Sequence, residues 1–175
     1  MGGHWEAELR AAGFDGLVVT GRAAGPVYLW IHDGQVEIHD AAHLWGKTTK
    51  ETEQAIREEL DEDRAELTMI GPGGENIVRF ACVMNGLYDA AGRTGMGAVM
   101  GSKKLKAIVV TGDLEVPMAD PEGIRELRRA YLKRAGGAYD GMHDEGTCGI
   151  TSDSAQSGDS PVKNWGGSGL VDFPR

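Results

Sequence analysis

Residues 89–112 read DAAGRTGMGAVMGSKKLKAIVVTG, which is the densest glycine segment of the chain followed directly by an apolar run. The end of this stretch, KKLKAIVVT at 103–111, has the continuous apolar character of a buried strand. Glycines at positions 92, 95, 97 and 101 precede it, so few side chains there keep a neighbouring group away from the backbone. The segment predicts a glycine bend that leads into a strand.

Two interpretations of this bend remain open. In the first, bare amide N–H groups, the planar fork of Arg93 and the ammonium groups of Lys103 and Lys104 together bind an anion. In the second, the glycines only make room for backbone to pack on backbone. Nucleotide motifs are excluded, because the order G-x-x-G-x-G is not the dinucleotide fingerprint and Gly97–Lys103 lacks P-loop spacing.

The rest of the chain up to about residue 134 predicts an α+β fold with short strands and about three helices. Asp33-Gly34 is a tight-turn signal between two β runs, and Thr48-x-x-Glu51 is a capping box that opens a helix. The predicted helices span residues 4–12, 48–60 and 121–134, and the predicted strands span residues 16–20, 26–31, 35–39, 67–70, 77–84 and 103–111. Strands and helices do not alternate regularly, which argues against a doubly wound parallel sheet.

The C-terminal part begins with a helix and then loses its pattern. Asp120-Pro121 predicts an N-cap followed by an N1 proline, with Ile124, Leu127 and Tyr131 on the buried face and Gly136-Gly137 at the end. From about residue 139 onward glycine, serine and aspartate dominate, so we expect an irregular segment that needs a neighbour to order it.

Composition narrows the class of protein. The 175 residues carry 18 Lys+Arg against 27 Asp+Glu, a net charge of −9, which argues against a nucleic-acid partner. No apolar run approaches the roughly 20 residues of a membrane helix, and no export leader opens the chain, so neither a membrane nor secretion is expected. The two cysteines, Cys82 and Cys148, form no disulfide framework, which favours a reducing, cytoplasmic location.

The glycine segment and several other blocks resemble the N-terminal domain of the aldehyde:ferredoxin oxidoreductase family, whose members are tungsten- or molybdenum-pterin enzymes. The resemblance covers nearly the whole chain, in order and spacing. The matching blocks are Met1–Gly21 with ELRAAGFDGLVVTG, Pro26–Thr52, Gly71–Phe80 with GPGGENIVRF, Asp89–Gly112, and the later segments Gly146-Thr147 and Pro161–Trp165.

This resemblance implies a fold and a set of cofactors. The family's first domain is a pair of β-sheets related by a pseudo-twofold axis, and it forms a platform for a bis-pterin whose metal is tungsten or molybdenum. A magnesium ion bridges the pterin phosphates, and a [4Fe–4S] cluster passes electrons to ferredoxin as an aldehyde becomes a carboxylic acid. On this basis we expect residues 1–118 to be part of that domain, residues 119–137 a helix leading out of it, and residues 138–175 an irregular segment toward a missing following domain.

The resemblance also implies individual contacts. Gly2, Ala90, Gly92 and Arg93 match positions that touch the pterin, and the carbonyl of Ala90 would bind magnesium, which prefers hard oxygen ligands. Asp89 departs from the pattern, because the family usually has an arginine there, aimed at the cofactor phosphates. No catalytic acid or base is assigned.

Other parts of the family pattern are missing from this chain. Cys82 and Cys148 match none of the cluster cysteines, so we expect a core thiol and a loop thiol. We therefore expect a fragment of a longer enzyme, inactive alone, with the remaining domains or subunits, ferredoxin and an aldehyde as partners and self-association through an uncovered face. The alternatives are a non-catalytic pterin- or anion-binding subunit and a truncated domain without activity.

The histidines and tryptophans give weaker signals. The five histidines have no metal-ligand spacing, and we expect His32 and His39 to lie on a solvated sheet edge beside the hairpin turn. Trp30, Trp45 and Trp165 are expected to be core or interface anchors.

Overall fold

The computed structural model describes residues 2–135, 140–160, 162–167 and 169–172. The chain divides into two compact units, Met1–Pro117 and Met118–Arg175. Among the described residues, no helix is both long and apolar enough to cross a membrane.

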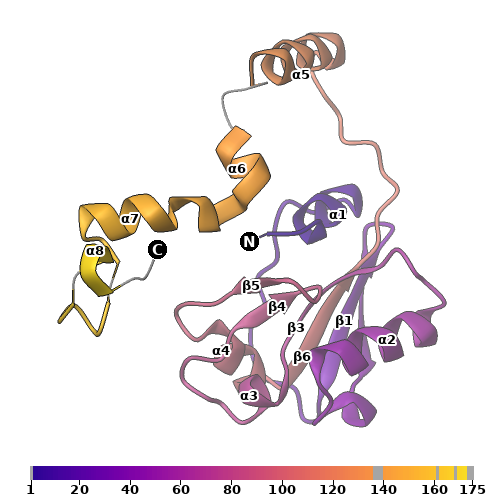
Figure 1. The fold of residues 1–175 in the computed structure, drawn as a ribbon. Helices are drawn as coiled ribbons and strands as arrows, with labels where there is room; N and C mark the ends of the chain where they lie inside the picture. The colour runs from indigo at the N-terminus through magenta and orange to yellow at the C-terminus, as the bar shows by residue number, and fades with distance from the viewer. Residues whose placement is uncertain (1, 136–139, 161, 168, 173–175) are drawn as a thin grey trace. The chain divides into compact units, whose positions relative to one another are not determined.

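The first unit is built on one six-stranded mixed sheet with the order β2-β1-β6-β3-β4-β5 (Figure 1). Of its strand pairs, β1 and β6 run parallel and the others run antiparallel. The strands are β1 Val27–His32, β2 Gln35–Asp40, β3 Glu66–Met69, β4 Val83–Asn85, β5 Asp89–Ala91 and β6 Leu105–Val110. The α+β class is thus confirmed, whereas the second sheet of a pseudo-twofold pair is not found in the described part of the chain.

The β1–β2 hairpin forms where the turn residues predict it. Asp33 and Gly34 both have positive φ, 47° and 73°, as a two-residue type I′ turn requires. This turn fixes the register, so that His32 pairs with Gln35 and Val27 with Asp40.

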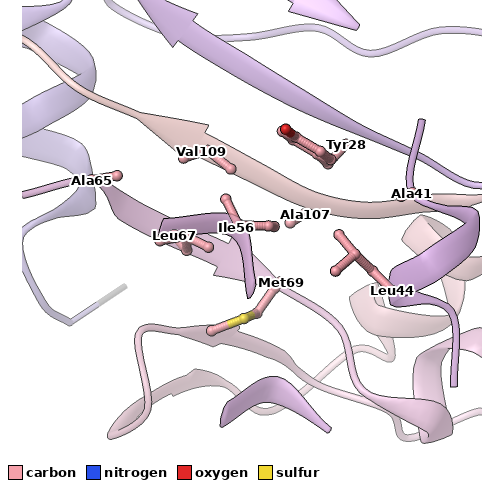
Figure 2. Close-up of a cluster of buried hydrophobic side chains, with 9 residues drawn as sticks. All are labelled: Tyr28, Ala41, Leu44, Ile56, Ala65, Leu67, Met69, Ala107 and Val109. Atoms are coloured by element: carbon pink, nitrogen blue, oxygen red, sulfur yellow. The ribbon is translucent and has the colours of Figure 1, made fainter. Parts of the chain in front are cut away.

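Helix α2, Thr49–Leu60, covers one face of the sheet. Thr48 and Glu51 form the predicted capping box, in which the Thr48 side chain accepts from the Glu51 amide and the Glu51 side chain from the Thr48 amide. Ile56 of this helix is fully buried. Figure 2 shows the cluster around it, which consists of Tyr28, Ala41, Leu44, Ile56, Ala65, Leu67, Met69, Ala107 and Val109.

The opposite face of the sheet is covered by two shorter helices. Helix α1, Trp5–Ala11, packs Leu9 against Ile31 and Val110. Helix α4, Met96–Ser102, contributes Met100 to a second cluster that also contains Leu29, Ile70, Val83 and Leu105. A further turn of helix, α3 (Pro72–Glu75), lies against α4 (Figure 1).

Three predictions for this unit were wrong. Residues 16–20 form no strand, because they pair with no strand of the sheet, and Val18 is left 93% exposed. Of the strand predicted over 77–84, only its end pairs, as β4. The glycine bend opens into helix α4 before β6, since three of its glycines pack so closely on backbone that helical geometry persists despite their poor propensity.

The second unit contains the predicted helix α5, Pro121–Ala135, and further short helices. Asp120 caps α5 by accepting from the Gly123 amide at 2.9 Å. Ile124, Leu127 and Tyr131 are 50%, 72% and 62% exposed rather than buried, because no element in the described residues of this unit packs on that stripe. Where we expected irregular chain, the structure has α6 Asp140–Glu145, the 3-10 helix η2 Gly146–Ile150, α7 Thr151–Ser157 and α8 Gly169–Asp172. The expectations placed on Gly136-Gly137 and Pro161 lie outside the described residues.

Candidate functional site

Two segments far apart in sequence meet at the start of the chain. The Asn85 side-chain amide donates a hydrogen bond to the Gly2 carbonyl. A Cβ added to Gly2 would overlap Oδ1 of Asp89, and one added to Gly3 would lie 2.6 Å from Nδ2 of Asn85. The structure therefore brings predicted residue Gly2 directly against strand β5, which carries predicted residue Ala90.

The predicted residues of the bend face the solvent. Ala90, Gly92 and Arg93 are exposed, and a Cβ on Gly92 would meet nothing within 4 Å. The next residue, Thr94, has φ 72°, a left-handed conformation that is uncommon for a residue with a side chain. This short stretch is thus an open surface of backbone with one guanidinium on it.

The other glycines of the segment have a different role. A Cβ on Gly95 would overlap the Arg79 carbonyl, and one on Gly97 would overlap the Cys82 carbonyl. The Gly97 amide also donates to Ala81 at 2.9 Å. The second interpretation of the bend therefore holds for the buried glycines Gly95, Gly97 and Gly101, which make room for backbone. Anion binding stays a prediction, and of its expected groups Lys103 and Lys104 donate instead to the carbonyls of Gly21 and Ala24.

A pocket of about 310 Å³ adjoins Gly3 and Asp89. Its lining includes Glu53 and Arg57, which pair at 2.8 Å, and Asn85, which is 3% exposed. Oε2 of Glu53, Nε of Arg57 and Oδ1 of Asn85 are buried and lack a hydrogen-bond partner. Two of these three atoms are acceptors, and with Glu66 and Asp89 also in the lining the pocket favours a cation or a donor-rich group.

Whether a phosphate-bearing cofactor fits the surface at Gly2, Gly92 and Arg93 depends on the shape and the charge of that surface. Gly92 gives a large flat group room to approach, because a Cβ there would meet nothing within 4 Å, and Arg93 offers donors. The backbone of Gly2 is exposed, but the Asp89 carboxylate already fills the space that a Cβ of Gly2 would take. Asp89, however, would repel a bare phosphate. The residues fit such a group when a divalent cation such as magnesium offsets that repulsion.

A second polar cluster, which the sequence analysis did not identify as one unit, lies on β1 and β2. His32 and His39 place their Nε2 atoms 3.3 Å and 2.9 Å from the two oxygens of Glu37. The hydrogen bonds with His39 and then His32 lower the pKa of Glu37. The rings stack on Trp30 and Tyr28, with centroid separations of 3.8 Å and 4.9 Å. Ring stacking and the Glu37 carboxylate thus hold both histidines in place. The expectation that they simply face solvent at a sheet edge was therefore wrong.

Glu59 extends this cluster. It accepts from the Tyr28 hydroxyl at 2.9 Å and lies 3.0 Å from His43 Nε2. Burial, followed by the hydrogen bond to Glu59, raises the pKa of Tyr28. No group of three His, Cys, Asp or Glu side chains in the described ranges is arranged to hold a metal ion.

The two cysteines and the remaining tryptophans differ in how far they are buried. Cys82 is half-buried, with its Sγ 3.7 Å from Met84 Sδ, and Cys148 is exposed on η2 of the second unit. Trp45 is half-buried, whereas Trp165 is 67% exposed and anchors no core within its unit.

Comparison with known proteins finds relatives among oxidoreductases, some of which are named as tungsten-containing. Residues 1–112 match the N-terminal domain of aldehyde ferredoxin oxidoreductase. The tungsten-containing aldehyde ferredoxin oxidoreductase of Pyrococcus furiosus is 45% identical over 170 residues, which are 94% of this chain and 28% of that protein. The WOR-like subunit of the aliphatic sulfonate oxidoreductase of the same organism is 38% identical, over 90% of this chain and 27% of that protein.

A solved structure agrees with these matches. The active-site complex BamBC of benzoyl coenzyme A reductase, with bound 1,5-dienoyl-CoA, superposes with a TM-score of 0.68 at 37% identity, over 89% of this chain and 20% of that one. The fold is therefore that of the N-terminal part of an oxidoreductase. The chain belongs to the aldehyde ferredoxin oxidoreductase family, and it spans less than a third of the relatives named here.

Proposed function

We propose that this chain is a cofactor-binding portion of an oxidoreductase and that it holds a tungsten- or molybdenum-bis-pterin on the surface formed by Gly2, Ala90, Gly92 and Arg93. The observation that carries the proposal is the meeting of Gly2 with β5, beside an open bend. Exposed backbone without side chains, followed directly by an exposed arginine, offers main-chain contacts and a planar set of donors to a large, flat, anionic group.

Each residue has a separate part in this proposal. Gly92 leaves room for the group to approach the main chain, the exposed backbone of Gly2 contacts it, and Arg93 donates hydrogen bonds to its phosphate or ring oxygens. The Ala90 carbonyl is proposed as a ligand of a bridging magnesium, whose charge would also offset Asp89. The bound group would supply oxygen-atom and two-electron transfer, by which an aldehyde becomes a carboxylic acid, with ferredoxin as the electron acceptor.

The names of the relatives support a role in cofactor binding rather than in substrate choice. Proteins named for aldehydes, aliphatic sulfonates and benzoyl coenzyme A share this portion at 37–45% identity. A part common to enzymes with such different substrates is best explained by what those enzymes share. Substrate recognition, the [4Fe–4S] cluster and the ferredoxin contact are therefore assigned to other domains or subunits, which would also enclose the pterins.

A second candidate is a non-catalytic pterin-binding subunit. The cysteines favour it, because Cys82 and Cys148 are separated between the two units and the chain has no others. In this case the cluster would come from a partner chain. A truncated domain that binds no ligand and self-associates is the third possibility.

The test is the Arg93→Ala variant, produced together with the remaining domains or subunits of the enzyme in a host that makes the tungsten pterin. We expect a several-fold drop in tungsten or molybdenum per protein, because the exposed guanidinium is lost while no buried contact is removed. Arg10→Ala is the matched control, since among the described residues the Arg10 side chain pairs with exposed Asp15, at 3.2 Å, on the same unit. An equal metal content in Arg93→Ala and the parent chain would contradict the assignment of Arg93.

A further inference from the structure

An ion pair lies in the interior of the first unit, away from the candidate site. The side chains of Lys106 on β6 and Glu75 on α3 are 0% and 3% exposed. Lys106 Nζ donates to Oε1 of Glu75 and, at 2.9 Å, to the Lys47 carbonyl, while Oε2 of Glu75 accepts from the Gly46 amide at 2.8 Å. The pair thus joins a strand, a helix and the loop before α2.

A break in the sheet register places Lys106 there. Val27 pairs with Leu105 and Tyr28 with Ala107, so Lys106 has no partner on β1. An extra residue of this kind bends the strand and redirects a side chain. Here it directs an ammonium group into the interior, toward the end of α3.

Such a pair is costly to bury, and apolar residues of the same size often give equal or greater stability. Stability alone therefore does not account for it. The position of the ion pair indicates a different role. Glu75 is the last residue of α3, so anchoring Glu75 fixes where the following segment starts.

The segment that follows Glu75, residues 76–82, packs against the backbone of the glycine bend. The carbonyls of Arg79 and Cys82 lie where a Cβ of Gly95 or Gly97 would stand. Helix α3 itself abuts α4, since a Cβ on Gly74 would lie 2.9 Å from the Gly97 carbonyl. A displacement of Glu75 would therefore reach the bend through direct backbone contacts.

Few buried apolar side chains hold residues 76–82 in place. Ile77 and Phe80 are 56% and 82% exposed. Ile77 also adopts φ 56°, a left-handed conformation that is unfavourable for a β-branched residue. The segment is thus held by its anchored start, by backbone hydrogen bonds such as that from the Ala81 amide to the Val78 carbonyl at 2.9 Å, and by the small residue Ala81, which is 9% exposed.

We propose that the Lys106–Glu75 ion pair positions the glycine bend, so that Lys106 and Glu75 are positioning residues for the ligand site at 90–93. The consequence for cofactor binding rests on the proposed function. The effect on the bend does not, and it can be measured in the chain without any cofactor.

The experiment is site-resolved amide hydrogen exchange on the full chain and on the variants Glu75→Gln and Lys106→Met. Loss of the pair should lower the protection of the Gly97 and Ala98 amides, which donate to Ala81 and Gly95, at least tenfold more than that of the β1–β2 hairpin amides. Arg64→Met is the control, because Arg64 pairs with Asp113 on the surface, with side chains 65% and 71% exposed. Glu75→Gln keeps an oxygen for the Gly46 amide, so it carries the test if Lys106→Met does not fold.

An equal fall in protection at the bend and at the hairpin would overturn the proposal, because it would show only a contribution to global stability. No change at either place would overturn it as well. Tungsten and pterin analysis of the parent protein, isolated with its natural partners, separates the two proposals: a loosened bend in the variants, together with a parent protein that holds neither metal nor pterin, supports the positioning role and contradicts the proposed function.

Discussion

The Asn85 side-chain amide donates to the carbonyl of Gly2 and so connects positions 83 residues apart. This bond holds the Gly2–Gly3 segment against β5, where a side chain on Gly2 would overlap the Asp89 carboxylate. The start of the chain and the β4–β5 turn therefore form one surface, and the charge of Asp89 belongs to that surface.

The first prediction concerns the negative charge of Asp89. Asp89→Asn removes a negative charge with little change of shape, and we expect it to raise the retention of a phosphate-bearing ligand about two- to tenfold. Asp89→Arg should raise it further. Metal and pterin content per protein is the measurement, and a lower content in Asp89→Asn would indicate that the carboxylate itself holds a cation.

The glycines of the bend give a matched pair of variants. Gly92→Ala should leave the free energy of unfolding within about 0.5 kcal/mol of the parent, because its Cβ meets nothing within 4 Å, yet it should reduce cofactor content. Gly97→Ala should destabilise by about 2 kcal/mol or more, because its Cβ would overlap the Cys82 carbonyl. Urea denaturation checks both, and equal stability of the two variants would contradict the division of roles.

Ile77 is expected to be a site of backbone strain. Ile77→Gly should stabilise the first unit by about 1 kcal/mol, because glycine adopts φ 56° readily and the isoleucine side chain is 56% exposed. Ile77→Ala, which keeps a Cβ, is the control and should not stabilise. A loss of stability in Ile77→Gly would show that the side chain has a packing partner.

The lowered pKa of Glu37 predicts that the free energy of unfolding depends on pH. Its pKa in the folded chain is lowered by His39 and His32, so the unfolded chain binds more protons in the acid range. The stabilisation is present above the ordinary glutamate pKa of about 4.3 and is lost as pH falls through the lower folded value. Glu37→Gln should flatten that acid limb in urea titrations between pH 3 and 6, and an unchanged slope would count against the assignment.

Local signals in the sequence predicted the parts of the fold that local chemistry determines. Asp33-Gly34 specified the hairpin turn, and Thr48 with Glu51 specified the start of α2. The turn also fixes the register, so the approach of Glu37 to His32 and His39 could have been found by pairing residues outward from it.

Other features depend on tertiary packing that spacing does not show. Helix α4 is rich in glycine and is stabilised by backbone contacts with α3 and residues 79–82, so its propensity gave no signal. The break that turns Lys106 toward Glu75 appears only once β1 and β6 are aligned. The approach of Gly2 to Asp89 likewise could be anticipated only from resemblance to a family.

The metal and pterin content of the purified protein tests the central claim most directly. We predict tungsten or molybdenum together with pterin, at about two pterins per metal, with iron present only where additional polypeptide supplies cysteines. A folded protein, isolated with all of its natural partners from a tungstate- and molybdate-supplied host, that contains neither metal nor pterin would contradict the account.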